Sequence, residues 1–510
     1  MAEQQILPEN RVVGQQAQLR SIAVAKSVSN CLRTTLGPRG MDKMILDPMG
    51  DFIVTNDGVT IMQELKVEDP IAKMLVEVSK SQELKVGDGT TTAVVLACEL
   101  LKNSESLIFE GIHPTIISHG YNFACNQAIK ILDKYTITIE PEDTDKLLNI
   151  ATTAMTGKSS EYSRDLLARL VVDAVTSMPV DFDKNNLKIK ALNGPVEDSN
   201  VIKGVILPKE RSHPDMPAKV ENAKILLVDF GIELRQPEGE HKYEVTDVCQ
   251  LQQFAEDEDR LVNEMLDTIF AAKPDVVICQ ANISDFALYK LAKAGIFAVK
   301  RIKRTTMERL SKAINTKIVS DIKDVKPDML SEPCTVEERT YSDDKLTFIT
   351  GCKNPESVTI LLFGSTDQVV DELKRAMEDA IGDIRCVLKN KKIVPGAGFI
   401  EAVISKELTD GEYQVTGRER LAIEMFAKSL ETIPKTLAES AGLDPIDTLP
   451  ELKMDKDSGV DVVNKKLTKI DELNVYEPYS VKQNAIKTAT EAAIRILRID
   501  DIMAGERKGN

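Results

Sequence analysis

The sequence GDGTTTAVVLACELL, at residues 87–101, places a glycine-flanked acid and three threonines directly before an apolar stripe. Its apolar residues recur at helical spacing, which predicts a helix over residues 90–101. The N–H groups that open this helix and the threonine hydroxyls would converge where a phosphate can bind. Asp88 would repel a bare phosphate, so the pattern favours a bridging Mg²⁺, which takes one or two carboxylates together with phosphate oxygens. The alternative is an aspartate that only caps the helix.

The segments before this stretch form further short elements. Apolar spacing predicts a helix over residues 15–32, which must end before Gly37-Pro38 because proline cannot continue it. The loop TTLGPRG, residues 34–40, either brings backbone amides close to a phosphate or forms a helix C-cap and a turn. Residues 43–47 and 52–55 read as the two strands of a hairpin.

The pattern changes in the middle of the chain. Short apolar strands are expected at residues 224–228, 275–279 and 297–299. Because helical stretches separate them, they predict a parallel α/β layer in a domain of its own.

Helical patterns resume toward the C-terminus. A strand at 358–362 and a long helix at 367–388 lead the chain back, and further helices are expected at 418–437 and 482–497. This layout predicts a helical domain split between the two ends of the chain, with the α/β domain inserted into it.

Charge and composition exclude several classes of partner. The chain has 65 basic and 81 acidic residues, a net charge of −16, which argues against nucleic acid because phosphate backbones need a basic surface. No apolar run reaches the roughly 20 residues that span a bilayer, and the start MAEQQILPENRVV lacks the layout of a secretory signal. We therefore expect no nucleic-acid or membrane partner and a cytoplasmic location. The eight cysteines form no CxxC pair, which supports neither a zinc site nor a redox motif.

A phosphate site in this chain must be assembled from several loops, since no GxxxxGK[ST] motif occurs. The candidate loops are TLGPRG at 35–40, NDG at 56–58, GDGTTT at 87–92, MTGK at 155–158 and VPGAG at 394–398.

These loops, in this order and with these gaps, resemble the group II chaperonins, the family of the archaeal thermosome and the eukaryotic cytosolic chaperonin. The matching blocks include RTTLGPRGMDKM, VTNDGVTI, GDGTTTAVVLA, GIHPTIISHGY, ENAKILLVDF, TGCKNPESVTILL, AGLDPIDTL and EAAIRILRIDDI. The resemblance runs from Ser21 to Met503, and several motifs together are far more specific than any one of them.

The resemblance implies ATP and Mg²⁺ as cofactors. The residues that would contact the nucleotide are Leu36, Gly37, Pro38, Gly89, Thr90, Thr91, Thr92, Gly396, Gly398 and Glu477. Within this set, residues 36–38 would cover the nucleotide, residues 89–92 would bind the phosphates, and the two glycines near 397 would flank the base and ribose. Asp88 would hold the Mg²⁺ ion.

Three further residues would carry the hydrolysis of ATP. The resemblance implies that Asp57 and Asp379 orient the attacking water and that Lys158 senses the γ-phosphate. Taken without the resemblance, Asp379 reads as a solvated acid on the charged helix face DELKRAMEDA.

Two positions depart from the family pattern. Three glycines followed by alanine are usual where this chain has Gly396-Ala397-Gly398-Phe399, so a methyl group and a phenyl ring enter a loop that approaches ligand. Phe399 either stacks near the adenine or packs into the core, and buried aromatic residues are usually structural. Phe363 stands where an arginine usually precedes the glycine of LLFGST, which predicts the loss of a polar or inter-subunit contact.

The resemblance implies a multidomain α and α/β fold with three domains: a helical equatorial ATPase domain split between the termini, a small α+β intermediate hinge domain and an inserted α/β apical domain. The equatorial domain would comprise residues 1–142 and 396–510, the intermediate domain 143–208 and 364–395, and the apical domain 209–363.

The polar segment around residues 231–253 would form a helical protrusion that serves as a built-in lid. The implied function is that of an ATP-dependent molecular chaperone, an ATPase whose hydrolysis closes the lid and encapsulates non-native polypeptides. Identical or related subunits would form two stacked rings with eightfold symmetry. Whether prefoldin delivers substrates is left open.

Two rival functions remain. A non-hydrolysing scaffold would keep the fold and lose turnover, which the departures at 397 and 399 favour and the retained acids disfavour. A small-molecule kinase would need a second substrate pocket, and no segment of the sequence suggests one.

Overall fold

The computed structural model describes residues 11–46, 52–64, 69–157, 163–179, 182–183, 186–233, 248–341, 344–352, 357–415, 417–455 and 457–503. The chain forms two compact units. Unit 1 takes in the described parts of Met1–Val172 and Asp371–Asn510, and unit 2 those of Asp173–Val370.

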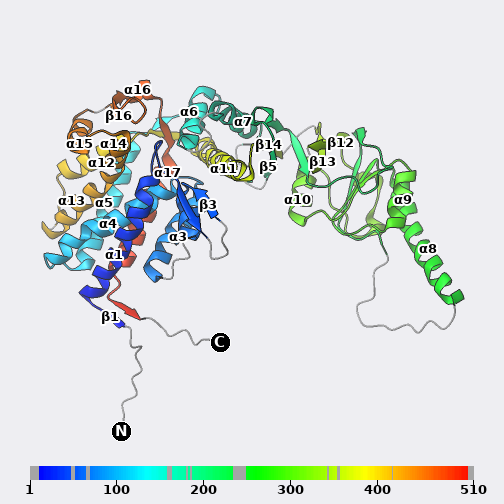
Figure 1. The fold of residues 1–510 in the computed structure, drawn as a ribbon, viewed down its shortest axis with the longest axis horizontal. Helices are drawn as coiled ribbons and strands as arrows, with labels where there is room; N and C mark the ends of the chain where they lie inside the picture. The colour runs from blue at the N-terminus through cyan, green and yellow to red at the C-terminus, as the bar shows by residue number, and fades with distance from the viewer. Residues whose placement is uncertain are drawn as a thin grey trace, which may run out of the picture. The chain divides into compact units, whose positions relative to one another are not determined.

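Unit 1 is a helical body built around one buried helix. Its long helices are α1 (Gln15–Leu32), α3 (Pro70–Lys85), α4 (Thr90–Phe109), α5 (Pro114–Lys134), α12 (Phe399–Asp410), α13 (Gly417–Leu430) and α17 (Tyr479–Leu497). Every residue from Ala93 to Leu101 in α4 is buried, as expected of a helix that is covered on all sides. Helices α1, α3, α13 and α17 pack around it, and Figure 1 shows α1, α4, α5 and α17 side by side. The predicted helix at 90–101 is therefore the centre of the core.

Shorter elements surround this body. The remaining helices with residues in unit 1 are α2 (Gly58–Glu64), α6 (Thr144–Met155), α7 (Arg164–Thr176), α11 (Asp367–Asn390), α14 (Thr432–Ala441), α15 (Pro445–Met454) and α16 (Ile470–Leu473). The strands are β1 (Arg11–Val13) with β19 (Asp501–Met503), β2 (Lys43–Leu46) with β3 (Phe52–Thr55), β16 (Ser458–Asp461) with β17 (Lys466–Lys469), and β15 (Lys392–Pro395) between β18 (Tyr476–Pro478) and β4 (Ile137–Thr138). All of these pairs are antiparallel.

One predicted helix of unit 1 is wrong in its continuity. The stretch 418–437 was expected to be a single helix, but α13 ends at Leu430 and α14 begins at Thr432. Pro434 explains the break, because its nitrogen cannot donate to the carbonyl four residues earlier. Pro434 is the third residue of α14. Backbone N–H groups in the first turn of a helix have no acceptor within the helix, so the N–H that proline lacks costs α14 no hydrogen bond.

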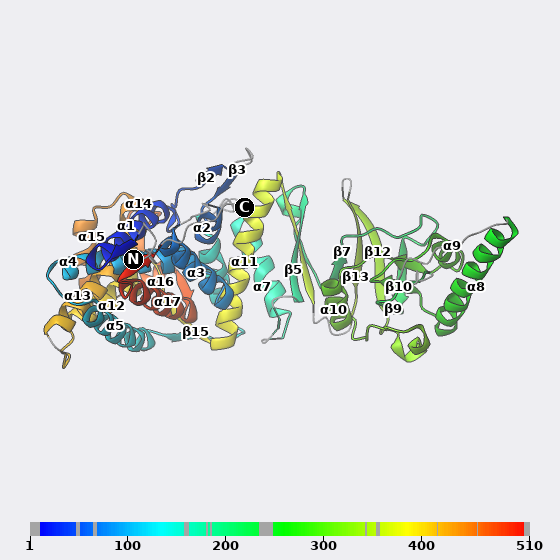
Figure 2. The same cartoon turned by 90° about the horizontal axis from the view of Figure 1, so that it is seen from below.

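Unit 2 contains the predicted parallel layer. Strand β10 (Val276–Cys279) lies between β9 (Ile225–Val228) and β11 (Phe297–Val299), and both neighbours run parallel to it. Alternate residues of these strands enter two separate apolar clusters, so both faces of the sheet are buried. Helices α8 (Val248–Ala272), α9 (Asp285–Lys293) and α10 (Arg304–Ala313) belong to the same unit (Figure 2).

The described part of unit 2 contains two further sheets (Figure 2). An antiparallel sheet has the order β7 (Gly204–Leu207), β13 (Asp344–Thr350), β12 (Cys334–Tyr341) and β8 (Lys219–Ala223), and a second has the order β5 (Leu187–Asn193), β14 (Val358–Gly364) and β6 (Asn200–Ile202). Phe363 in β14 is 4% exposed, with its ring centroid 5.6 Å from that of Tyr341. The phenyl ring at this position is therefore part of an apolar cluster within the unit.

The predicted lid falls largely outside the described residues, which end at Glu233 and resume at Val248 with α8. In the described part of the chain, no helix has the length and apolar character needed to cross a membrane.

Candidate functional site

A cavity of about 760 Å³ lies in unit 1, within the usual size range of small-molecule sites. Most of the residues proposed from the sequence line it: Leu36, Gly37, Pro38, Asp57, Asp88, Gly89, Thr90, Thr91, Thr92, Asp379, Gly398 and Glu477. Gly396 is not part of the lining, and Lys158 lies outside the described residues. Segments from both ends of the chain thus meet at one site.

The N-terminus of α4 opens onto this cavity. Its N-cap is Gly89 at φ 74°, and no side chain caps the helix, so the alternative of a merely capping Asp88 does not hold. A Cβ atom at Gly89 would lie 2.7 Å from Val481 Cγ1, so a larger residue would force Val481 to shift and would be strained at this φ. The first N–H groups of a 20-residue helix are therefore available to an anion, beside the hydroxyls of Thr90 and Thr91.

Loops that line the cavity also meet one another at close range. The side chain of Asn56 donates a hydrogen bond to the carbonyl of Gly157 at 2.8 Å. A Cβ atom at Gly157 would lie 2.8 Å from the Cα of Pro38, and one at Gly58 would lie 2.5 Å from Thr91 Oγ1. Glycine at these positions lets the backbones approach, as the sequence predicted for a site assembled from several loops.

The loop at 396–398 places its residues differently. The amide of Gly396 donates to the carbonyl of Val475 at 3.0 Å, and a Cβ atom on Gly396 would lie 2.8 Å from Glu477 Oε1. Ala397 lines the cavity with φ 54°, a left-handed conformation that costs a residue with a Cβ atom about 1–2 kcal/mol. The methyl group therefore strains the loop.

Phe399 follows this loop but does not line the cavity. It is 3% exposed, and its ring meets that of Tyr135 edge to face with 6.1 Å between centroids. Of the two roles considered for this ring, packing in the core is the one observed.

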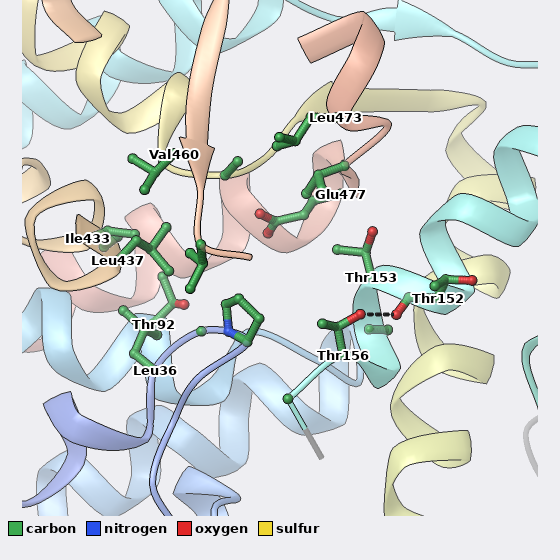
Figure 3. Close-up of a pocket in the computed structure, with 18 of the residues that line it drawn as sticks. Leu36, Thr92, Thr152, Thr153, Thr156, Ile433, Leu437, Val460, Leu473 and Glu477 are labelled. Atoms are coloured by element: carbon green, nitrogen blue, oxygen red, sulfur yellow. Dashed lines mark hydrogen bonds between the residues drawn. The ribbon is translucent and has the colours of Figure 1, made fainter. Parts of the chain in front are cut away.

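Figure 3 shows that the cavity has an apolar side and a hydroxyl-rich side. Ile433, Leu437 and Val460 lie on the first, and three threonines of α6 and its C-terminal end lie on the second. The Thr156 hydroxyl donates to the carbonyl of Thr152 at 2.6 Å. The cavity can therefore hold a ligand with an apolar part and a polar part.

Acidic side chains dominate the charge of the lining. Among the described residues, seven carboxylates and three cationic side chains line it: Asp57, Asp88, Asp379, Asp383, Asp461, Glu472 and Glu477, against Arg164, Lys466 and Lys482. A bare polyphosphate would be repelled by this excess of negative charge, so an anionic ligand must bring cations with it.

The Asp57 carboxylate has a local structural role as well. It accepts hydrogen bonds from the backbone amide of Thr60 at 3.0 Å and from the hydroxyl of Thr60 at 2.7 Å, at the start of α2. Because each carboxylate oxygen has two acceptor sites, this arrangement fixes the side chain and leaves capacity toward the cavity.

Helix α11 presents two acids to the cavity, one helical turn apart. Asp379 is partly buried, whereas Asp383 is 3% exposed, and its Oδ1 has no hydrogen-bond partner among the described residues. Burial, followed by the nearby charge of Asp88, raises the pKa of Asp383 well above its usual value.

Glu477 takes part in a buried ion-pair cluster with Lys482 and Glu401. Lys482 Nζ lies 2.7 Å from Glu401 Oε1 and 2.8 Å from Glu477 Oε2. Burial opposes the charge of Lys482, but Glu401 and Glu477 outweigh it and raise the pKa of the lysine, which therefore stays protonated. Lys482 thus fixes the position of Glu477 at the cavity.

Comparison with known proteins identifies the family. The model of the TCP-1/cpn60 chaperonin family matches residues 28–507. The chain belongs to the TCP-1/cpn60 chaperonin family. The thermosome subunit beta of Archaeoglobus fulgidus is 47% identical over 508 residues, 97% of this chain and 93% of that protein. The thermosome subunit beta of Methanothermobacter thermautotrophicus is 47% identical over 514 residues, which cover 99% of this chain and 95% of that protein. The thermosome subunit alpha of Thermoplasma acidophilum is 45% identical over 509 residues, which cover 98% of this chain and 93% of that protein. The predicted relationship to the group II chaperonins is confirmed.

Sequence reasoning missed several cavity residues of this chaperonin-family chain. These are Asp383, Asp461, Lys482 and the threonines at 152, 153 and 156. The spacing of Asp379 and Asp383 was a usable signal, because residues four apart share a helix face. Nothing in the sequence pointed to Lys482, which reads as one charge on an amphipathic helix.

The residues present fit a divalent cation held jointly with a ligand. No group of three or more His, Cys, Asp or Glu side chains is gathered for a metal ion in the described ranges. Mg²⁺ does not need such a cage, since it takes one or two carboxylates, phosphate oxygens and several waters. Asp88, beside the N-terminus of α4, matches that requirement.

Proposed function

We propose that this chain is an ATP-hydrolysing chaperonin subunit that folds non-native polypeptides, with the unit 1 cavity as its nucleotide site. The observation that carries the proposal is the N-terminus of α4, which opens beside Asp88 into an acid-rich cavity of about 760 Å³. Such a site suits a polyphosphate that arrives with a divalent cation.

The two sides of the cavity suggest how a nucleotide would bind. Ile433, Leu437 and Val460 would receive the base, and the ribose would lie toward Gly398 and Glu477. The loop 36–38 would cover the nucleotide. The amides and hydroxyls of residues 89–92 would bind the phosphates, because a helix N-terminus stabilises negative charge.

Asp88 would hold Mg²⁺, which when bound neutralises the charge that builds up on the phosphate oxygens. Asp57 and Asp379 would orient the water that attacks the γ-phosphate. The hydrogen bonds from Thr60 support this role for Asp57, because they fix its carboxylate at the cavity. Lys158 would sense the γ-phosphate.

Nucleotide turnover would drive encapsulation. In this proposal the equatorial domain is 1–142 with 396–510, the hinge domain 143–208 with 364–395, and the apical domain 209–363 with its lid at 231–253. Subunits would stack as two eightfold rings in the cytoplasm and enclose the polypeptide substrate, with prefoldin as a candidate partner in delivery. The thermosome names of the relatives support the chaperonin part of this proposal.

The test is phosphate release from ATP by the purified, assembled protein, with Mg²⁺ and with a chelator. We expect Mg²⁺-dependent release, together with ATP-dependent protection of a denatured client protein from protease. ATP binding without release would indicate the non-hydrolysing scaffold, and transfer of the phosphate to a small acceptor would indicate a kinase.

A further inference from the structure

Asp383 is a buried acid that the proposed mechanism does not use. Asp383 lies in α11 and is 3% exposed. Its Oδ1 has no hydrogen-bond partner among the described residues. Leaving a buried polar group unpaired is destabilising, and more so for a charged group. A polar atom of this kind therefore calls for an explanation.

The backbone brings Asp383 to the loop that carries Asp88. A Cβ atom on Gly382 would lie 3.1 Å from the Cα of Gly87, and one on Gly87 would lie 3.1 Å from the Cα of Gly382. One turn later in α11, the Cys386 thiol donates to the carbonyl of Val86 at 3.4 Å. Helix α11 therefore packs directly on residues 86–87, and both carboxylates line one cavity.

The charged groups that act on Asp383 are negative. Asp88, Asp379 and Glu477 all disfavour the ionised form of its carboxyl group. Lys482, a cation of the same cavity, is already held by Glu401 and Glu477. A divalent cation between Asp88 and Asp383 would turn this repulsion into attraction.

We propose that Asp383 is a second carboxylate for the divalent cation assigned to Asp88, reaching the ion through a water of its hydration shell. The inference rests on the proposed function, because it concerns the same cation. Mg²⁺ keeps several waters when it binds between carboxylates and phosphates, so an acid behind the direct ligand has a water to hold. Partners of this kind typically change metal affinity about 10- to 100-fold.

The test measures cation binding directly. Mn²⁺ is titrated into assembled protein saturated with ADP, and free Mn²⁺ is followed by electron paramagnetic resonance. Asp383→Asn keeps the shape of the side chain and removes its charge, so Mn²⁺ affinity should fall about 10-fold or more. Glu378→Gln makes the same acid-to-amide change at an exposed position of α11 and should leave the affinity unchanged.

A second variant at position 383 is needed in case the asparagine side chain of Asp383→Asn disturbs folding. Asp383→Val replaces an unpaired buried polar group with an apolar one of similar volume, so it should unfold no earlier than the unchanged protein. It should lose Mn²⁺ affinity as Asp383→Asn does, while ADP binding with a chelator present stays unchanged in both.

Asp88→Asn separates this inference from the proposed function. Loss of Mn²⁺ affinity in both Asp88→Asn and Asp383→Asn supports the inference. Loss in Asp88→Asn alone overturns it and leaves the proposed function in place. No loss in either variant overturns the inference and the cation assignment of Asp88 together.

Discussion

Lys482 Nζ lies 2.7 Å from Glu401 Oε1, and the two side chains are only 7% and 3% exposed. Removing one partner leaves an uncompensated buried charge, which costs about 3–5 kcal/mol. Lys482→Met should therefore lower the midpoint of thermal unfolding strongly. Lys482→Met leaves both Glu401 and Glu477 without their cation. Glu401→Leu/Lys482→Met leaves only Glu477 without it, so this double variant should be more stable than Lys482→Met. Scanning calorimetry of the assembled protein measures both.

The same pair predicts a pH dependence. The pKa of Lys482 is raised in the folded chain above the ordinary value of 10.5. A raised pKa means that the folded state holds its proton more tightly than the unfolded state, so the contribution is complete below about pH 10 and is lost as the pH rises through the folded pKa. The unfolding midpoint of the unchanged protein should thus fall above pH 10 more steeply than that of the double variant. Parallel curves would contradict this assignment.

Ala397 should be a site at which glycine stabilises the chain. Its φ of 54° is left-handed, and Ala397→Gly relieves the strain of that conformation. The free energy of unfolding should rise by about 1 kcal/mol from this relief, reduced by the greater conformational entropy of glycine in the unfolded chain. The matched control is Gly398→Ala, which places a Cβ atom 2.8 Å from Pro434 Cβ at φ 75° and should destabilise. Unfolding midpoints of the two variants should move in opposite directions.

Phe399 should matter for stability and not for nucleotide affinity. Phe399→Ala removes a ring that is 3% exposed and packs on Tyr135, so a loss of about 3–5 kcal/mol is expected from the cavity left behind. ATP affinity per folded molecule, measured by calorimetry, should stay unchanged because the ring does not line the site. A large loss of affinity without destabilisation would mean that the ring stacks on the base.

Cys352 should be the more reactive thiol of a close pair. The pairing of Thr335 with Thr350 brings Cys334, at the start of β12, near Cys352 just after β13. The interaction with the Cys334 side chain lowers the pKa of Cys352 although partial burial opposes it.

Alkylation of Cys352 by iodoacetamide, followed by mass spectrometry across pH, should therefore have a lower midpoint in the folded protein than in the denatured protein. In Cys334→Ala the midpoint should move upward. An unchanged midpoint would exclude the interaction with Cys334 as the cause.

The sequence allowed the elements to be predicted better than their contacts. Helix α1 and the parallel strands follow from local periodicity, and the predicted bounds of α1 agree with the structure. The break before α14 was not predicted. Proline is tolerated in the first turn of a helix, and the sequence pattern alone did not show that a new helix begins at Thr432.

The candidate site divides in the same way. Its loops were predicted, since glycine clusters mark where backbones approach. Asp383 was not, because its position depends on the contact of Gly382 with Gly87, residues that lie far apart in the chain. Periodicity locates a helix face, but it does not say which distant loop that face meets.

Two acids of the cavity should separate nucleotide binding from hydrolysis. Asp88→Ala should weaken the binding of Mg-ATP as well as turnover, because the cation would lose its carboxylate. Asp379→Ala should bind ATP nearly as well as the unchanged protein and lose about 10²-fold or more in hydrolysis, the scale expected for a positioned acid–base group. Calorimetry for binding and single-turnover hydrolysis for chemistry measure the two effects separately.

Asp57 tests whether the two proposed water-orienting acids act together. Asp57→Ala should resemble Asp379→Ala in hydrolysis, with an added loss of stability because Thr60 loses its acceptor at the start of α2. The double variant should lose much less activity than the product of the two single losses, since both acids would act on one water. If Asp379→Ala hydrolyses ATP at the rate of the unchanged protein, Asp379 is an acid of the cavity wall without a part in the chemistry. The matched variant Glu378→Gln, one residue away and exposed, shows whether a charge lost from α11 alone alters the rate.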